Sequence, residues 1–101
     1  MFIRLCSTSE LPAEGQAAEI TVTDRVICVA KVNGQISAMN NVCLHRGGPL
    51  GQGLIEGNKI VCPWHGWVFD IQTGAASHDS RARVPVYPVK IEGGDVMIDF
   101  E

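Results

Sequence analysis

Two short motifs in this sequence could together hold a metal centre. Cys43 and His45 form a Cys-x-His motif, and Cys62 and His65 form a Cys-x-x-His motif further along the chain. Each motif supplies one thiolate and one imidazole, so the two loops together supply two sulfur and two nitrogen donors. That set suits a [2Fe–2S] cluster with two cysteines on one iron and two histidines on the other. It also suits a tetrahedral zinc ion.

The distribution of the ligands favours the cluster over zinc. Zinc fingers usually place both cysteines in one knuckle and both histidines in another. Here each loop carries one cysteine and one histidine. A structural zinc domain or a redox-sensing interaction module stays open as an alternative class of function. An absorption spectrum separates the two classes, because iron–sulfur clusters absorb visible light and zinc does not.

The residues around both motifs resemble the two cluster-binding loops of the Rieske family. The matching segments read Cys-Leu-His-Arg-Gly-Gly-Pro-Leu over 43–50 and Cys-Pro-Trp-His-Gly-Trp-Val-Phe-Asp over 62–70. Of the branches of that family, the small soluble Rieske-type ferredoxins match best. The resemblance implies one [2Fe–2S] cluster per chain, with the cysteines on the inner iron and the histidines on the outer iron. The implied ligands are Cys43, His45, Cys62 and His65.

Two departures from the respiratory branch of that family bear on the reduction potential. Respiratory members carry an extra cysteine in each loop, joined as a disulfide, and these positions hold Gly48 and Trp64 here. They also carry hydroxyl donors to the cluster sulfurs where this chain has Trp67 and Phe69. Fewer hydrogen bonds to sulfur stabilise the reduced cluster less. We therefore expect a potential towards the low end of the Rieske range of about −150 to +300 mV.

Glycines just past the ligands indicate tightly wrapped loops. Gly47, Gly48 and Gly66 lie where a chain around a cluster needs unusual φ/ψ angles and exposed N–H groups. Gly51 and Gly53 follow in the same region, where simple turn geometry is an alternative explanation for both.

Two further segments bear on the site. Residues 83–88, Arg-Val-Pro-Val-Tyr-Pro, resemble the proline-containing third loop that covers the cluster in this family, although they also suit the start of a strand. His78 is the third histidine, beside Asp79 in a polar loop. A non-haem iron site needs two histidines and a carboxylate, which one spare histidine cannot supply. The chain also lacks a GxGxxG nucleotide fingerprint, so we expect an electron-transfer component and not an enzyme.

Size and composition predict one small domain over residues 1–101. The chain is 46% hydrophobic, which suffices for a core without disulfide bonds. Cys6 and Cys28 lie among apolar neighbours, so we expect buried, reduced thiols there. No apolar run is long enough for a transmembrane helix or a signal peptide, which predicts a cytoplasmic monomer that does not bind membranes. The net charge of −3, with no basic block, argues against nucleic acid as a partner.

Strand signals recur along the chain, with tight turns between them. Asn33-Gly34 is the clearest turn, because this pair favours positive φ at both central positions of a hairpin. Residues 7–15 indicate a loop or a single helical turn, and no stretch of twelve residues has a helical period. The expected strands are 2–6, 19–23, 26–32, 35–39, 54–55, 60–61, 67–70, 86–92 and 95–100.

These elements predict an all-β domain in which the cluster loops are an insertion. The loops, at about 41–75, lie between strands of a base formed by both ends of the chain. The resemblance implies the same arrangement, a small cluster-binding subdomain on an antiparallel β-sandwich or barrel.

A one-electron carrier is the function that the sequence favours. By resemblance, it takes electrons from a flavin-dependent reductase and passes them to a terminal ring-hydroxylating oxygenase that acts on aromatic compounds. The exposed edge formed by His45 and His65 would be the point of transfer. The alternative is the small Rieske subunit of an assimilatory NADH-dependent nitrite reductase, whose partner is the large sirohaem-binding subunit. The sequence does not identify the partner.

Overall fold

The computed structural model describes residues 1–44, 47–64 and 66–99, and β-strands dominate this part of the chain. Every strand pairing in it is antiparallel, which confirms the all-β prediction. None of its helices is long and apolar enough to cross a membrane. The strands are β1 (Phe2–Ser7), β2 (Gln16–Val22), β3 (Arg25–Val32), β4 (Gln35–Asn40), β5 (Leu54–Glu56), β6 (Lys59–Val61), β7 (Val68–Asp70), β8 (Ala75–Ala76), β9 (Asp79–Arg83), β10 (Val86–Tyr87), β11 (Val89–Glu92) and β12 (Asp95–Asp99); the 3₁₀ helices are η1 (Thr8–Glu10) and η2 (Leu50–Gln52).

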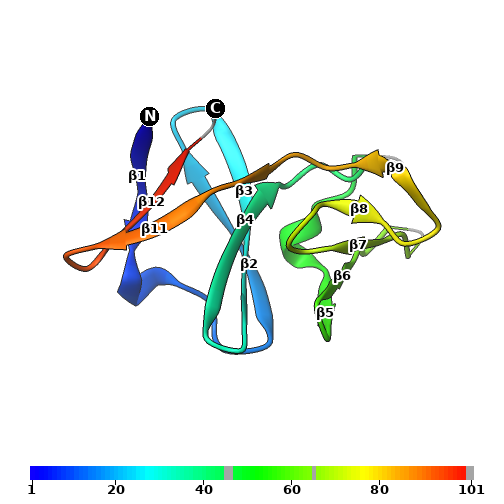
Figure 1. The fold of residues 1–101 in the computed structure, drawn as a ribbon, viewed down its shortest axis with the longest axis horizontal. Coiled ribbons are helices and arrows are strands. Elements are labelled where there is room, and N and C mark those ends of the chain that lie inside the picture. The colour runs from blue at the N-terminus through cyan, green and yellow to red at the C-terminus, as the bar shows by residue number, and fades with distance from the viewer. Residues whose placement is uncertain (45–46, 65, 100–101) are drawn as a thin grey trace.

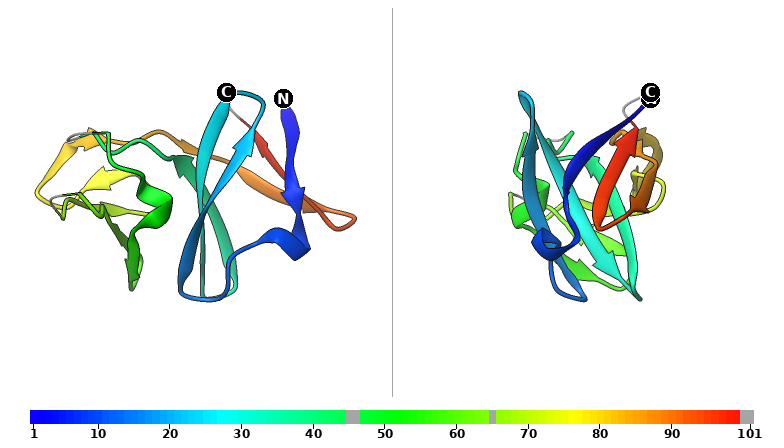
Figure 2. Two further views of the ribbon diagram at one scale, coloured as in Figure 1. Left: turned by 180° about the vertical axis from the view of Figure 1, so that it is seen from behind. Right: turned by 90° about the vertical axis from the view of Figure 1, so that its left-hand side faces the viewer.

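Two sheets, which we call the base, occupy one end of the molecule (Figure 1). One sheet has the order β1-β12-β11 and the other β10-β4-β3-β2, so both ends of the chain contribute, as predicted. The right-hand view of Figure 2 shows the two sheets side by side in the base. Alternating apolar side chains of both sheets meet in a common core. Its fully buried members include Ile27, Val29, Val96 and Ile98.

A third sheet, which we call the inserted sheet, lies at the opposite end (Figure 1). Its order is β5-β6-β7-β8-β9, so each strand pairs with its neighbours in the sequence. The whole sheet arises between β4 and β10, which pair with each other in the base. The predicted insertion of a small subdomain into the base is therefore confirmed. A second core beneath this sheet includes Leu50, Ile60 and Phe69, all fully buried.

The predicted Asn33-Gly34 turn joins β3 to β4. Asn33 has φ +54° and Gly34 has φ +76°, the positive pair that this turn requires. The Glu14 carboxylate accepts both backbone N–H groups of the turn, at 2.5 Å from Asn33 and 2.9 Å from Gly34. These hydrogen bonds lower the pKa of Glu14.

The expected strand 86–92 is two strands in the structure. β10 pairs with β4, whereas β11 pairs with β12 in the other sheet. Pro88 lies between them. Proline has no N–H for a strand ladder, and the chain leaves one sheet and joins the other at this residue.

Three further differences concern strands of weak β-propensity. β2 begins at Gln16, before the expected Glu19, because Gln16–Ala18 extend the ladder with β3. The polar or alanine-rich strands β8 and β9 were not predicted, since pairing with neighbouring strands and not residue type determines where they form.

The expected burial of Cys6 and Cys28 is confirmed.

Candidate metal centre

The structure brings the two predicted sulfur donors together from different loops. Cys43 lies in the loop that follows β4, and Cys62 directly follows β6. Both side chains are buried, at 2% and 1% exposure, and both belong to the core beneath the inserted sheet. The two predicted nitrogen donors, His45 and His65, lie outside the described residues.

The two thiols lie close enough for one to affect the protonation of the other. Burial raises the pKa of Cys62, and the neighbouring Cys43 thiol raises it further. The backbone N–H of Trp64 donates to the Cys62 sulfur at 3.4 Å and acts in the opposite direction. Thiolate is the form that binds metal, so occupation of the site has to displace these protons.

Gly48 is required for the contact between the two loops. A Cβ atom at this position would lie 2.7 Å from the Cys62 sulfur and 3.0 Å from Cγ of Trp64. The expectation of unusual backbone angles is confirmed at Gly47 and Gly66, each with φ +73°. It is wrong at Gly48, which is not among the residues of positive φ. What this position requires is the absence of a side chain.

The same contact places residues 48 and 64 opposite each other. A Cβ at Gly48 would lie 3.1 Å from Cβ of Trp64, a little closer than the roughly 3.5–4.5 Å of a disulfide. These are the positions at which the resemblance implied a disulfide in respiratory relatives. Here Trp64 packs directly on the Gly48 backbone, and all four cysteines of the chain are free thiols.

Backbone hydrogen bonds close the loops that carry Cys43 and Cys62. The N–H of Cys43 donates to the Gly48 carbonyl at 2.9 Å, and the N–H of Gly47 donates to the Cys43 carbonyl at 2.8 Å. In the second loop the N–H of Cys62 donates to the Trp67 carbonyl at 2.7 Å. Both loops are thus closed hydrogen-bonded turns that aim their sulfurs into the same core.

The rings at positions 67 and 69 contribute packing and no hydroxyl group. Phe69 is fully buried in the core that contains both cysteines. Trp67 is partly buried against that core, and its ring centroid lies 6.2 Å from that of Phe69. His78 packs edge-on against Trp67, with 4.2 Å between the ring centroids. The candidate third loop also reaches this core, through the buried side chain of Val84.

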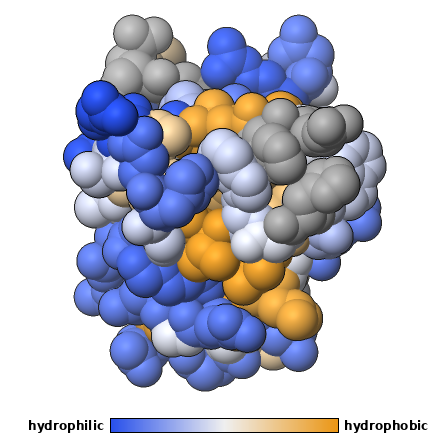
Figure 3. All heavy atoms as spheres, turned by 90° about the vertical axis from the view of Figure 1, so that its right-hand side faces the viewer, coloured by the Kyte–Doolittle hydropathy of each residue, from blue (hydrophilic) through white to orange (hydrophobic). Residues whose placement is uncertain are grey.

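Two apolar side chains on the loops, those of Val42 and Leu44, were missed as functional candidates, whereas the sequence suggested Trp64 as part of a docking patch. Val42, Leu44 and Trp64 are large hydrophobic residues that are 53%, 48% and 50% exposed. Figure 3 views the molecule from the end of the inserted sheet and shows apolar side chains at its surface. The signal in the sequence was the pair of apolar residues on either side of Cys43, in a loop where polar residues are usual.

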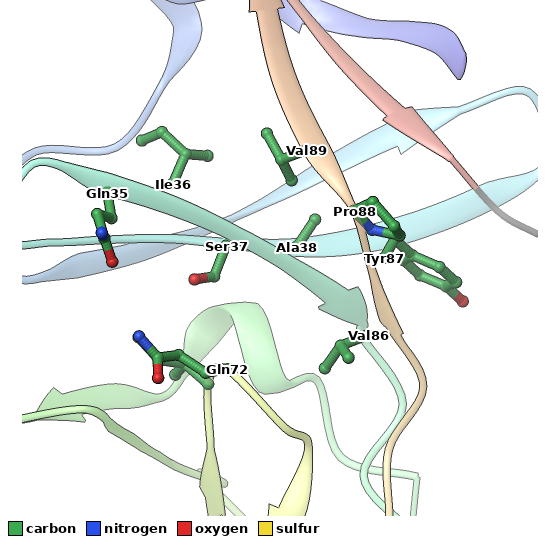
Figure 4. Close-up of a pocket in the computed structure, with 10 residues that line it drawn as sticks. Gln35, Ile36, Ser37, Ala38, Gln72, Val86, Tyr87, Pro88 and Val89 are labelled. Carbon is green, nitrogen blue, oxygen red and sulfur yellow. The ribbon is translucent and has the colours of Figure 1, made fainter. Parts of the chain in front are cut away.

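Two grooves in the described part of the chain are not lined by the paired thiols. One groove of about 440 Å³ follows the crease between the base and the turn at Ile71-Gln72, and Figure 4 shows its side chains. A second groove of about 620 Å³ lies beneath Val42 and beside Pro85. Neither is lined by a cysteine or a histidine, so neither competes with the loops as a metal centre.

The described residues fit a metal centre that needs two thiolates from two loops. The sulfurs are buried and adjacent, a glycine leaves room beside one of them, and a backbone N–H already points at sulfur. Within residues 1–44, 47–64 and 66–99, no group of three or more histidine, cysteine or acidic side chains could hold a metal ion elsewhere.

Comparisons with known proteins agree with this geometry. The sequence matches the Rieske [2Fe–2S] domain over residues 1–88. The ferredoxin component of the naphthalene 1,2-dioxygenase system of Pseudomonas aeruginosa is 40% identical over 92 residues, covering 90% of this chain and 88% of that protein. The structure of the Sphingomonas yanoikuyae B1 ferredoxin superposes with a TM-score of 0.87 at 33% identity, over 100% of both chains. A chain from a complex of reduced oxygenase and oxidized ferredoxin in carbazole 1,9a-dioxygenase superposes with a TM-score of 0.84 at 26% identity, over 99% of this chain and 94% of that one.

Proposed function

Since this chain belongs to the Rieske [2Fe–2S] family, we propose that it is a one-electron carrier of a ring-hydroxylating dioxygenase system. It accepts electrons from a flavin-dependent reductase and delivers them to a terminal oxygenase, in the cytoplasm and as a monomer. Residues 1–101 form one domain, with the cluster-binding part at about 41–75. The observation that carries the proposal is the meeting of two buried thiols, Cys43 and Cys62, from two loops at one end of the molecule.

Each side chain at the site has a role in this proposal. When bound, the cluster supplies a single reversible electron. Cys43 and Cys62 would hold the inner iron, in a buried apolar core. His45 and His65 would hold the outer iron and serve as the point of electron transfer. Short hydrogen-bonded loops keep Cys43 and Cys62 in place, which limits reorganisation between the two redox states.

The relatives support an oxygenase as the electron acceptor. The first relatives by sequence are named as ferredoxin components of dioxygenase systems, and a solved relative is described in complex with its oxygenase. These names favour an oxygenase over the large subunit of a nitrite reductase. The family match likewise favours a [2Fe–2S] cluster over zinc.

Reconstitution of the electron-transfer chain tests the proposal. The purified protein is expected to contain two irons and two sulfides per chain and to absorb visible light. With NADH and a flavin-dependent reductase it should become reduced, and it should then be reoxidised by a terminal aromatic-ring oxygenase. A colourless zinc protein would refute the proposed electron-carrier function. Reoxidation by a nitrite reductase subunit and not by the oxygenase would refute the oxygenase as the electron acceptor.

Docking onto the oxygenase is expected to depend on the exposed apolar side chains of the ligand loops. Leu44→Ala and Trp64→Ala each remove apolar area that a partner would bury. Loss of one well-buried apolar anchor costs about 1–2 kcal/mol, which corresponds to roughly a 5–30-fold rise in the apparent KM for this carrier. Steady-state assays at varied carrier concentration measure that change.

Ile91→Ala is the matched control for Leu44→Ala. Ile91 is an aliphatic residue of similar exposure, 53% against 48%. It lies on β11, at the end of the base far from the ligand loops (Figure 1). The control should leave KM unchanged. Equal effects of the two substitutions would show that docking does not use the loops.

A further inference from the structure

A polar clamp connects the base to the first ligand loop. Asn41, at the start of this loop, donates its side-chain amide to the Glu19 carboxylate of β2 at 2.6 Å. The same carboxylate accepts the side-chain amide of Gln52 at 2.9 Å. The Asn41 side-chain oxygen accepts the Gly51 N–H at 2.7 Å, and its carbonyl accepts the Leu50 N–H at 2.8 Å. Asn41 therefore joins both ends of the loop that carries Cys43.

The clamp is tightly packed as well as hydrogen-bonded. Asn41 is only 6% exposed, and a buried amide has to keep its partners. A Cβ atom at Gly51 would lie 2.5 Å from Cγ of Glu19 and 2.9 Å from the Asn41 side-chain oxygen. The close approach of Glu19 and Asn41, and not turn geometry, thus explains why residue 51 is a glycine. The Glu19 side chain lies directly against the far end of the loop.

The Glu19 carboxylate has an electrostatic effect on a residue of the core that contains Cys43 and Cys62. Glu19 is the sheet partner of Cys28, so both side chains lie on the same face of the base. Burial raises the pKa of Cys28 to about 12, and the Glu19 carboxylate adds to that rise. Cys28 belongs to the same buried core as Cys43 and Cys62. Both clamp partners of Glu19 are neutral amides, so neither cancels its charge.

We propose that Asn41 and Glu19 are positioning residues for the cluster: Asn41 holds the Cys43 loop in its binding geometry, and the Glu19 charge lowers the reduction potential. This inference rests on the proposed function, since it requires a cluster at Cys43 and Cys62. Reduction adds negative charge to the centre, and a nearby fixed carboxylate opposes it. Glu19 is exposed, so solvent reduces this effect without reversing its sign.

Three side-chain substitutions separate the charge from the hydrogen bonds. Glu19→Gln removes the charge and keeps the shape, and it should raise the midpoint potential measured by protein-film voltammetry. Gln52→Met removes one hydrogen bond but keeps the charge, so the potential should not rise. Glu14→Gln is the matched control, since Glu14 also accepts two N–H groups but caps the distant turn at Asn33-Gly34. It should leave the potential unchanged.

Asn41→Ala tests the positioning role on the same protein. Iron should be lost to a chelator several-fold faster than from the wild-type protein, and the electron paramagnetic resonance spectrum of the reduced cluster should shift. Glu14→Gln should change neither property. Because Glu19 and Gln52 are exposed, their variants should fold even where Asn41→Ala does not. The midpoint potentials of these variants then test the proposal.

Each outcome bears on one hypothesis. A Glu19→Gln potential equal to that of the wild-type protein, or an equal rise in Glu14→Gln, would overturn the charge role. Unchanged chelation kinetics and spectrum in folded Asn41→Ala would overturn the positioning role. A wild-type protein that binds no iron would instead overturn the proposed function.

Discussion

Replacing either Cys43 or Cys62 with serine is expected to abolish the bound iron and the visible absorption of the protein. A serine hydroxyl is a hard donor that does not replace a soft thiolate on an iron–sulfur cluster. Both side chains are fully buried, so no neighbouring water or surface group can take the vacant place. Iron and sulfide analysis of the purified variants measures the loss, and circular dichroism reports whether the β-structure persists.

Cys28→Ser is the matched control for these two variants. Cys28 has the same residue type, the same burial of 1% and a place in the same core as Cys62. Burial raises its pKa to about 12, and it lies on β3, outside both Cys/His motifs. The control, and Cys6→Ser in the other core, should retain two irons per chain. Loss of iron from folded Cys28→Ser, or its retention in Cys43→Ser, would overturn the ligand assignment.

Gly74→Ala is expected to destabilise the protein by about 3 kcal/mol or more. Gly74 has φ +78°, and a Cβ there would lie 2.0 Å from the Val84 carbonyl oxygen. Backbone has to move to relieve such a contact. The N–H of Val84 also donates to the Gly74 carbonyl at 2.9 Å, so the movement strains a hydrogen bond beside the core that contains Cys43 and Cys62. Thermal unfolding followed by circular dichroism gives the change in Tm.

Gly15→Ala separates the clash from the backbone strain. Gly15 has the same φ of +78°, but nothing lies within 4 Å of a Cβ at that position. Strain alone costs roughly 1–2 kcal/mol. A change of 1 kcal/mol shifts Tm by about 4–8 °C in a domain of this size. Gly74→Ala should therefore lower Tm clearly further than Gly15→Ala. Equal shifts would mean that Val84 moves away without cost.

The sequence predicted the parts of the fold that depend on the intrinsic conformational preferences of single residues. The apolar run of β3 and the Asn33-Gly34 turn are of this kind, since β-branched packing and positive φ are properties of the residues themselves. The strands β8 and β9 carry no such signal. They exist because β7 offers a free edge, and that edge appears only after folding.

The site divides in the same way. Cys43 and Cys62 were predicted as ligands because each lies beside a histidine in a short motif, and such a split set has few other uses. The clamp between Glu19 and Asn41 was not found, because a surface carboxylate and a loop asparagine are common and nothing local indicates that they meet. For Gly48, the sequence predicted unusual backbone angles, which is the wrong reason for a glycine at this position. Its lack of a side chain matters through a contact with the other loop, which no single loop sequence reveals.

The order of strands in the three sheets also bears on how the chain folds. Within the inserted sheet every pairing joins neighbours in the sequence, whereas Phe2 of β1 pairs with Asp99 of β12. Short loops close at a lower entropic cost, and topologies rich in local contacts fold faster. The inserted sheet, which carries Cys62 directly after β6, can thus form while β1 still lacks its partner strand. The turn that holds Cys62 would then be formed before the first strand of the base is paired.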